Sequence, residues 1–221
     1  NISLKVRMDL KMKVKILQIK KSAREAYVLV KTFAQKDSAA IVLIAAGLLG
    51  FVIGILHATW QVSLESAQVV ARTVAYSTPT PFYWYHTKLW TLMVQAPALF
   101  LYLGMSARVL SFIVSGVVGM FSFQALSLII YAVSGRKLLA ILSPSFIYTT
   151  EAVSLFSGSY YIHLMATMHT YGMIGLAFAV LVLGLISVGY NRFGGFLLGL
   201  APAVHPSIGL WLIFIVVISF L

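Results

Sequence analysis

Two acidic side chains are the first candidates for chemistry in this sequence. Beyond residue 37 the chain contains only two acids, Glu65 and Glu151, within a long and mostly apolar stretch. An ionisable group close to a membrane is costly and often marks a functional site. We therefore expect Glu65 to act as a general base that deprotonates an acceptor hydroxyl. The alternative is a solvated loop carboxylate, or one paired with Arg72 or Lys88.

Basic and imidazole side chains could complete such a site. Arg72, Lys88 and His169 could hold a phosphate group, because charged donors form strong hydrogen bonds to phosphate oxygens. Glu151 could position a substrate or a divalent cation. His163 and His169 are not spaced to place two ligands on one helix face, so the sequence predicts no metal site. Because the chain has no cysteine, disulfides, thiolate ligands and a cysteine nucleophile are excluded.

The composition shows what kind of fold must position these residues. The chain has 221 residues, of which 61% are hydrophobic and 10% are charged. A soluble domain carries about 25% charged residues and could not bury this much apolar surface. The sequence therefore predicts an all-α, polytopic transmembrane helical bundle, which is a multi-pass integral membrane protein in contact with the lipid bilayer.

The apolar runs predict where the chain crosses the membrane. A spanning helix needs about 20 apolar residues, and the run at 89–104 is shorter and is interrupted by Gln95 and Pro97. We expect that run to be a juxtamembrane helix within an outer loop, 58–106. The domain 38–221 then contains about five spanning helices, predicted at 38–57, 107–133, 138–156, 170–189 and 196–221.

The distribution of positive charge predicts the orientation. Residues 1–37 hold ten of the 16 Lys and Arg residues, so we expect the N-terminus to be cytoplasmic. If 89–104 does not cross, 13 of these cations lie inside and three outside; if it crosses, the division is 11 and five. The positive-inside rule favours the first arrangement, which puts Glu65 and Glu151 on the outer side in a common vestibule.

The segment 1–37 is predicted to be basic and cytoplasmic or interfacial. Residues 2–16 alternate apolar and mainly basic side chains, which is typical of a strand that docks on another membrane subunit. The alternative is a disordered or interfacial basic leader. From Ile16 onward the spacing is helical, as in an amphipathic helix on an anionic leaflet. We expect no nucleic-acid partner, because positive charge belongs beside a membrane span.

Two further features concern the predicted spans. Gly47, Gly50 and Gly54 share one side of the first span, which indicates close helix packing or ordinary glycine enrichment in membrane helices. The pair His205-Pro206 interrupts the last span, either as a plain kink or as a break that lines a cavity. Because the chain starts at Asn1 and ends inside an apolar run, we expect it to be part of a longer protein.

The order of these features resembles the N-terminal module of the glycosyltransferase C (GT-C) superfamily of polytopic membrane glycosyltransferases. The resemblance covers roughly residues 38–221. A first span is followed by an acid on the first outer loop, where Glu65 stands, and then by an amphipathic outer segment and a half-length apolar piece. Small residues in that segment lead to Tyr76 and Pro79, and Glu151 lies near the place of a second family acid.

The resemblance implies a function for the candidate residues. Enzymes of this family transfer a sugar from a polyprenyl-phosphate donor on the outer face of the membrane, and Glu65 would be the catalytic base. The resemblance also implies inversion at the sugar and no nucleotide-sugar site. Two other classes stay open: a non-catalytic structural subunit of a larger membrane complex, and a transporter whose path is lined by the His205-Pro206 break.

Overall fold

The structure is a computed structural model that describes residues 38–56, 58, 64–75, 80–88, 90–149 and 171–219. Within these ranges the chain forms nine helices and no strand, so the predicted all-α class is correct for them. Contacts divide the chain into the units Asn1–Ser38 and Ala39–Leu221, and the second unit is described below. The predictions for segment 1–37, including the strand at 2–16, lie outside the described residues.

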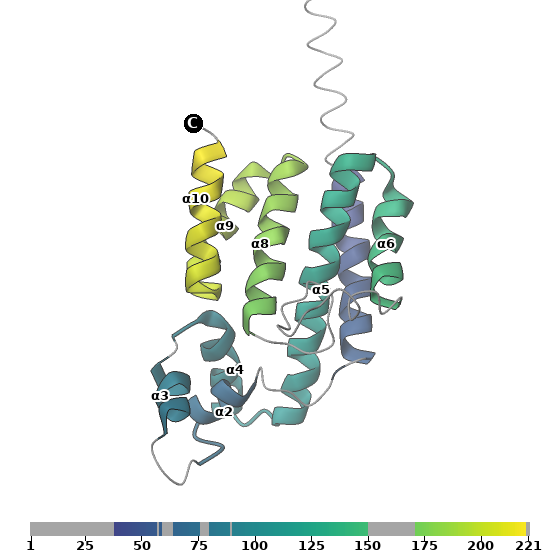
Figure 1. Cartoon of the computed structure of the whole chain (residues 1–221). Helices are drawn as coiled ribbons and strands as arrows, with labels where there is room; N and C mark the ends of the chain where they lie inside the picture. Colours follow the sequence, from purple (N-terminus) through teal and green to yellow (C-terminus); the bar gives the residue numbers. More distant parts are fainter. Residues whose placement is uncertain are drawn as a thin grey trace, which may run out of the picture. The chain divides into compact units, whose positions relative to one another are not determined.

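Helices make up most of the described part of the second unit (Figure 1). The helix Ser38–Leu56 comes before the labelled helices. The labelled helices are α2 (Glu65–Val70), α3 (Pro81–Lys88), α4 (Leu92–Tyr102), α5 (Ala107–Ser134), α6 (Lys137–Thr149), α8 (Tyr171–Ser187), α9 (Asn191–Val204) and α10 (Pro206–Ser219).

Two of the described helices are long and apolar enough to cross a membrane. Ser38–Leu56 has 19 residues and α5 has 28. At 1.5 Å per residue they are about 28 and 42 Å long, against a hydrocarbon core of about 30 Å. Their bounds agree closely with the predicted spans 38–57 and 107–133. The Ser106 hydroxyl caps the start of α5 by accepting a hydrogen bond from the Val109 N–H, and Gly135 ends the helix in a left-handed conformation.

The Ser38–Leu56 helix packs closely against α5 through glycine. A Cβ at Gly50 would meet the Gly119 carbonyl oxygen, and a Cβ at Gly54 would meet the Ser115 carbonyl oxygen. At Gly47 the space is filled by Gln124, whose Nε2 donates a hydrogen bond of 3.1 Å to the Leu43 carbonyl oxygen. The prediction of close helix packing at these three glycines is thus confirmed. Because position 47 meets 124 and position 54 meets 115, the two helices are antiparallel.

The helices α5 and α8 run side by side in the same direction. Near the start of α8, Ile174 belongs to one buried cluster with Val118, which lies in the first half of α5. Near the end of α8, Leu185 shares another cluster with Leu128, which lies in the second half of α5. The second cluster also contains Ala39, so the start of the Ser38–Leu56 helix lies at the same end of the unit.

We name one end of this unit the basic end, because its described charged residues are all positive. It is where α5 ends and where α6 and α9 begin, and it carries Arg136, Lys137 and Arg192. The opposite end is where α5 begins, and it carries α2, α3 and α4 (Figure 1), with the cations Arg72, Lys88 and Arg108 and the acid Glu65. This grouping of cations matches the sequence count in which 89–104 does not cross.

Helix α4 corresponds to the short apolar run predicted at 89–104. It has 11 residues, which corresponds to a length of about 16 Å, roughly half of a hydrocarbon core. It packs on α2 and on the start of α5, and its first residues, Leu92 and Met93, contact the cluster around α8. The prediction of a piece that is too short to span is therefore correct.

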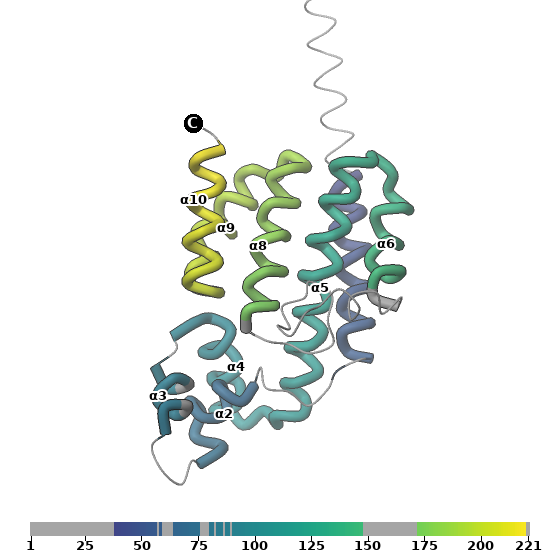
Figure 2. Tube along the Cα trace, in the orientation of Figure 1, coloured from purple at the N-terminus to yellow at the C-terminus, as the bar shows by residue number. Residues whose placement is uncertain are grey.

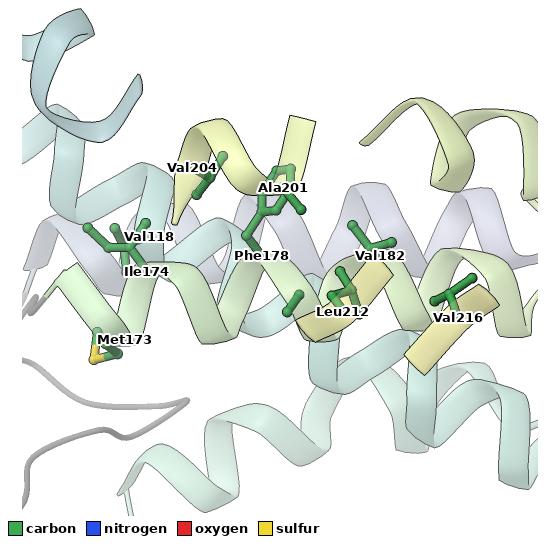
Figure 3. Packing of buried hydrophobic residues seen from close by; sticks show 10 residues of the cluster. Val118, Met173, Ile174, Phe178, Val182, Ala201, Val204, Leu212 and Val216 are labelled. Atoms are coloured by element: carbon green, nitrogen blue, oxygen red, sulfur yellow. The ribbon is translucent and has the colours of Figure 1, made fainter. Parts of the chain in front are cut away.

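The predicted last span, 196–221, is wrong. This part of the chain forms two separate helices, α9 and α10 (Figure 2), with His205 between them. In one continuous helix Gly209 and Ala201 would be about 12 Å apart. Instead, a Cβ at Gly209 would clash with the backbone of Ala201 and Pro202. Residues of both helices pack around Phe178 and Val182 of α8 (Figure 3).

Candidate functional site

The segment that carries Glu65 is held by a small core of its own. Buried apolar residues from α2, α4 and the beginning of α5 pack together, with partly buried neighbours around them. The buried members are Leu64, Ala67, Ala98, Leu101 and Leu110. Because α2 has only six residues, it would not be stable alone, and this packing is what orders it.

Glu65 is the first residue of α2 and is exposed. The next two residues, Ser66 and Ala67, are buried against the small core, so the backbone that carries Glu65 is fixed. A carboxylate in the first turn also interacts favourably with the helix dipole. The predicted base is therefore an exposed carboxylate on an anchored backbone, at the end of the unit that lies opposite Arg136 and Lys137.

Arg72 lies directly after α2 in an uncommon backbone conformation. Its φ of 57° is in the left-handed region, where a non-glycine residue costs about 1 kcal/mol. The Arg72 N–H donates to the Val69 carbonyl at 3.1 Å, and the Thr73 N–H donates to the Gln68 carbonyl at 3.0 Å. These two bonds form a Schellman motif, in which the Arg72 position usually belongs to glycine. The motif presents the Arg72 side chain to solvent.

Lys88 ends α3 and lies against an aromatic ring. Its Nζ is 5.2 Å from the centroid of the Trp84 ring, which is the geometry of a cation–π contact. Trp84 is itself half exposed. At the other end of α3 the Thr80 hydroxyl accepts a hydrogen bond from the Tyr83 N–H at 3.2 Å. An exposed cation beside an exposed indole is typical of the membrane–water interface.

Three of the predicted site residues lie on or next to the neighbouring helices α2 and α3. Glu65 is the first residue of α2, and Arg72 lies two residues after its last residue. Lys88 is the last residue of α3, which packs against α2. Glu65 and Arg72 are two helical turns apart, or about 10 Å along an axis, so their side chains do not share one turn. Glu151, His163 and His169 lie outside the described residues, and the common vestibule of Glu65 and Glu151 stays a prediction.

No metal centre is assembled by the part of the chain that the structure describes. Within it, no group of three or more His, Asp or Glu side chains is close enough to hold an ion. Glu65 is the one acid in the described ranges, and the other acid of this half of the chain, Glu151, falls in a gap between them. A divalent cation that depends on Glu151 stays a prediction.

Sequence reasoning missed two polar side chains that the fold buries. Thr91, at the start of α4, is fully buried, and its hydroxyl has no hydrogen-bond partner among the described residues. Ser127, in α5, is buried in the same way. A threonine directly before an apolar run is a recognisable helix start, but the burial of its hydroxyl depends on packing from distant helices.

The chain was compared with known protein families, with curated proteins and with solved structures, and nothing matches in any of the three. The resemblance to the glycosyltransferase C superfamily therefore rests on the order of the sequence features. Any statement of activity rests on the residues themselves.

Proposed function

We propose that this chain is part of a membrane glycosyltransferase that transfers a sugar from a polyprenyl-phosphate donor on the outer face of the membrane. One observation carries the proposal. An exposed carboxylate, Glu65, sits on an anchored helix start shortly after a membrane-capable helix, at the end of the unit opposite Arg136 and Lys137. Neither a loop acid on a mobile chain nor a buried structural acid has this combination of exposure and fixed backbone.

The proposed orientation follows from the sequence count, because each end of the described unit carries three Lys or Arg residues. Ten of the 16 Lys and Arg residues precede Ser38, whose helix starts at the basic end, so the positive-inside rule puts the basic end inside and the end with α2, α3 and α4 outside. We further propose a multi-pass topology with four crossings. The first two are made by Ser38–Leu56 and α5, the third begins at α6, and the fourth is made by α8.

The proposed reaction uses the described residues in distinct roles. Glu65 accepts the proton of an acceptor hydroxyl as the acceptor oxygen forms a bond to the anomeric carbon of the sugar. The bond between that carbon and the donor phosphate breaks at the same time, and the polyprenyl phosphate leaves with the electron pair. Arg72 and Lys88 are the described cations closest in sequence to Glu65, and each could stabilise the phosphate charge.

Donor specificity tests this proposal. The full-length protein, reconstituted in vesicles, is expected to transfer sugar from a polyprenyl-phosphate donor and not from a nucleotide sugar. The Glu65→Gln variant is expected to lose transfer while retaining the fold, because the amide cannot accept the proton. Transfer from a nucleotide sugar, or unchanged transfer by Glu65→Gln, would contradict the proposal.

A second candidate function is transport, and one specific observation favours it. Half-length helices that reverse inside a membrane commonly line binding sites in transporters, and α9 and α10 are short helices between which the chain reverses at His205. In that case a His205→Leu variant would lose transport of a solute across sealed vesicles, whereas Glu65→Gln would not. The two variants therefore separate the two candidates.

A further inference from the structure

We infer that α9 and α10 form a re-entrant hairpin, which enters the membrane from the basic side, turns at His205 and returns to the same side. This path through the membrane does not depend on sugar transfer. The chain reverses direction twice in this region. The first reversal lies between α8 and α9, and the second lies at His205 between α9 and α10.

The first reversal is a tight turn at the end of α8. Gly189 has a φ of 90°, its N–H donates to the Ile186 carbonyl, and the Tyr190 N–H donates to the Leu185 carbonyl. This Schellman motif ends α8 and sends α9 back along it. A Cβ at Gly194 of α9 would be 2.8 Å from Cγ1 of Ile186, so the two helices are in close contact immediately after the turn.

The second reversal lies well short of the opposite end. A Cβ at Gly175 of α8 would be 2.7 Å from the Cβ of His205, which places the apex of the hairpin beside Gly175. From Ser187 at the basic end of α8 to Gly175 is about 18 Å along the helix axis. The hydrocarbon core is about 30 Å thick, so the apex reaches about two thirds of the way through it. Helix α9, with 14 residues or about 21 Å, is too short to cross.

Three backbone N–H groups of the apex have hydrogen-bond partners, which favours a turn at this depth. The His205 N–H donates to the Ala201 carbonyl at 2.9 Å, and the Gly209 N–H donates to the His205 carbonyl at 2.8 Å. The His205 Nδ1 caps α10 by accepting a hydrogen bond of 3.3 Å from the Ile208 N–H. Pro206 has no N–H to satisfy. These contacts lower the cost of placing the turn away from water.

The two arms pack tightly and present an apolar outer surface. Gly209 lies directly against the backbone of Ala201, the kind of small-residue contact that brings helices close together in membranes. Between Leu210 and Ile218 the exposed side chains of α10 are all hydrophobic, and each is more than half exposed. They are Leu210, Trp211, Phe214, Ile215, Val217 and Ile218. Lipid is the surrounding that such a face fits, because the Trp211 indole N–H is the one polar side-chain group on it.

A hairpin and a crossing helix differ in the side of the membrane on which their two ends lie. The hairpin puts Asn191 and Ser219 on one side of the membrane, whereas the single span that hydropathy predicts would put them on opposite sides. These 221 residues contain no native cysteine, so they add no background to the labelling of single cysteines placed among them. Both positions are exposed and polar, which makes them suitable for substitution.

The test is labelling of single cysteines with a membrane-impermeant maleimide in sealed vesicles of known orientation. Asn191→Cys and Ser219→Cys are the test variants of the full-length protein. Ser134→Cys marks the basic end and Thr73→Cys marks the opposite end, and both reference positions are exposed. Labelling after detergent solubilisation shows that each variant is folded and reactive.

We expect cysteines at 191 and 219 to be labelled from the side that labels 134, and not from the side that labels 73. Labelling of 219 together with 73 would overturn the hairpin, because the chain would then cross. Labelling of 219 from neither side would also overturn it, because the geometry puts this residue level with Asn191.

Discussion

Replacing Gly119 by alanine tests the helix crossing that holds α5 in place. The added methyl group would meet the Gly50 carbonyl oxygen and would lie 3.0 Å from the Gly54 Cα. The first contact is with backbone, which cannot rotate away. Because carbon and oxygen atoms normally approach to about 3.3–3.6 Å, the two helices must separate by about 1 Å.

Two effects set the cost of that separation in stability. Overpacking in a rigid interface typically costs about 1–3 kcal/mol. The separation also stretches the hydrogen bond between Gln124 and the Leu43 carbonyl, which at 3.1 Å has little room, and an interhelical bond of this kind contributes about 1 kcal/mol in a membrane protein. We expect Gly119→Ala to lower the free energy of unfolding by about 2–4 kcal/mol.

The assay is unfolding of the full-length protein in mixed micelles with increasing SDS. Gly199→Ala is the matched control, because a Cβ at this position of α9 has nothing within 4 Å. The control should be neutral or stabilising by up to about 1 kcal/mol, since alanine is the better helix former. Gln124→Leu should cost about 1 kcal/mol alone and less in the Gly119→Ala background. Equal stability of Gly119→Ala and Gly199→Ala would refute the crossing.

Further predictions concern the turn after α2 and the apex of the hairpin. Glycine fits the left-handed backbone at position 72, so Arg72→Gly should raise the free energy of unfolding by about 1 kcal/mol. The same variant lacks the guanidinium group and should bind a polyprenyl-phosphate donor more weakly, with a higher KM. An unchanged KM would show that Arg72 is not part of the site. His205→Asn keeps a capping oxygen for α10 and should be nearly neutral, whereas His205→Ala should cost about 1 kcal/mol in SDS unfolding; equal losses would count against the cap. Gly175→Leu should displace the apex and lower stability by more than either of these variants, and an unchanged SDS midpoint would argue against the packing of α8 on His205.

The long helices could be predicted because each follows from a local pattern. The first two spans are uninterrupted apolar runs, and Ser106 and Gly135 signal the start and end of α5 in the sequence itself. The close approach of Gly50 and Gly54 was one of two open interpretations, and only the positions of Ser115 and Gly119 on the partner helix decide between them. Such a decision needs the tertiary structure.

The hairpin shows what hydropathy cannot determine. A residue before proline favours an extended backbone, and His205 has φ −147° and ψ 106°, so the break itself could be foreseen. Whether the chain then continues across or folds back depends on the packing of Gly209 on Ala201 and of His205 on Gly175. The apolar run has the same composition in both cases, so a crossing was predicted where the structure has a reversal.

The candidate site was predictable only in part. The sequence indicates an acid on an outer segment, which identifies Glu65, but it does not show that the small core around Ala67 fixes the backbone there. The sequence also gives no reason to expect a left-handed backbone at Arg72, because the left-handed residue that ends a helix is usually glycine. The catalytic role of Glu65 stays a prediction until transfer is measured.

The central claim is that Glu65 is the base in sugar transfer. The most direct measurement is the rate of transfer from a polyprenyl-phosphate donor by the full-length protein, with Glu65→Gln and Glu65→Asp compared with wild type. General base catalysis contributes about 10²–10⁴-fold, so Glu65→Gln should lose that factor in kcat while Glu65→Asp retains part of the activity. A wild-type rate for Glu65→Gln would contradict the account.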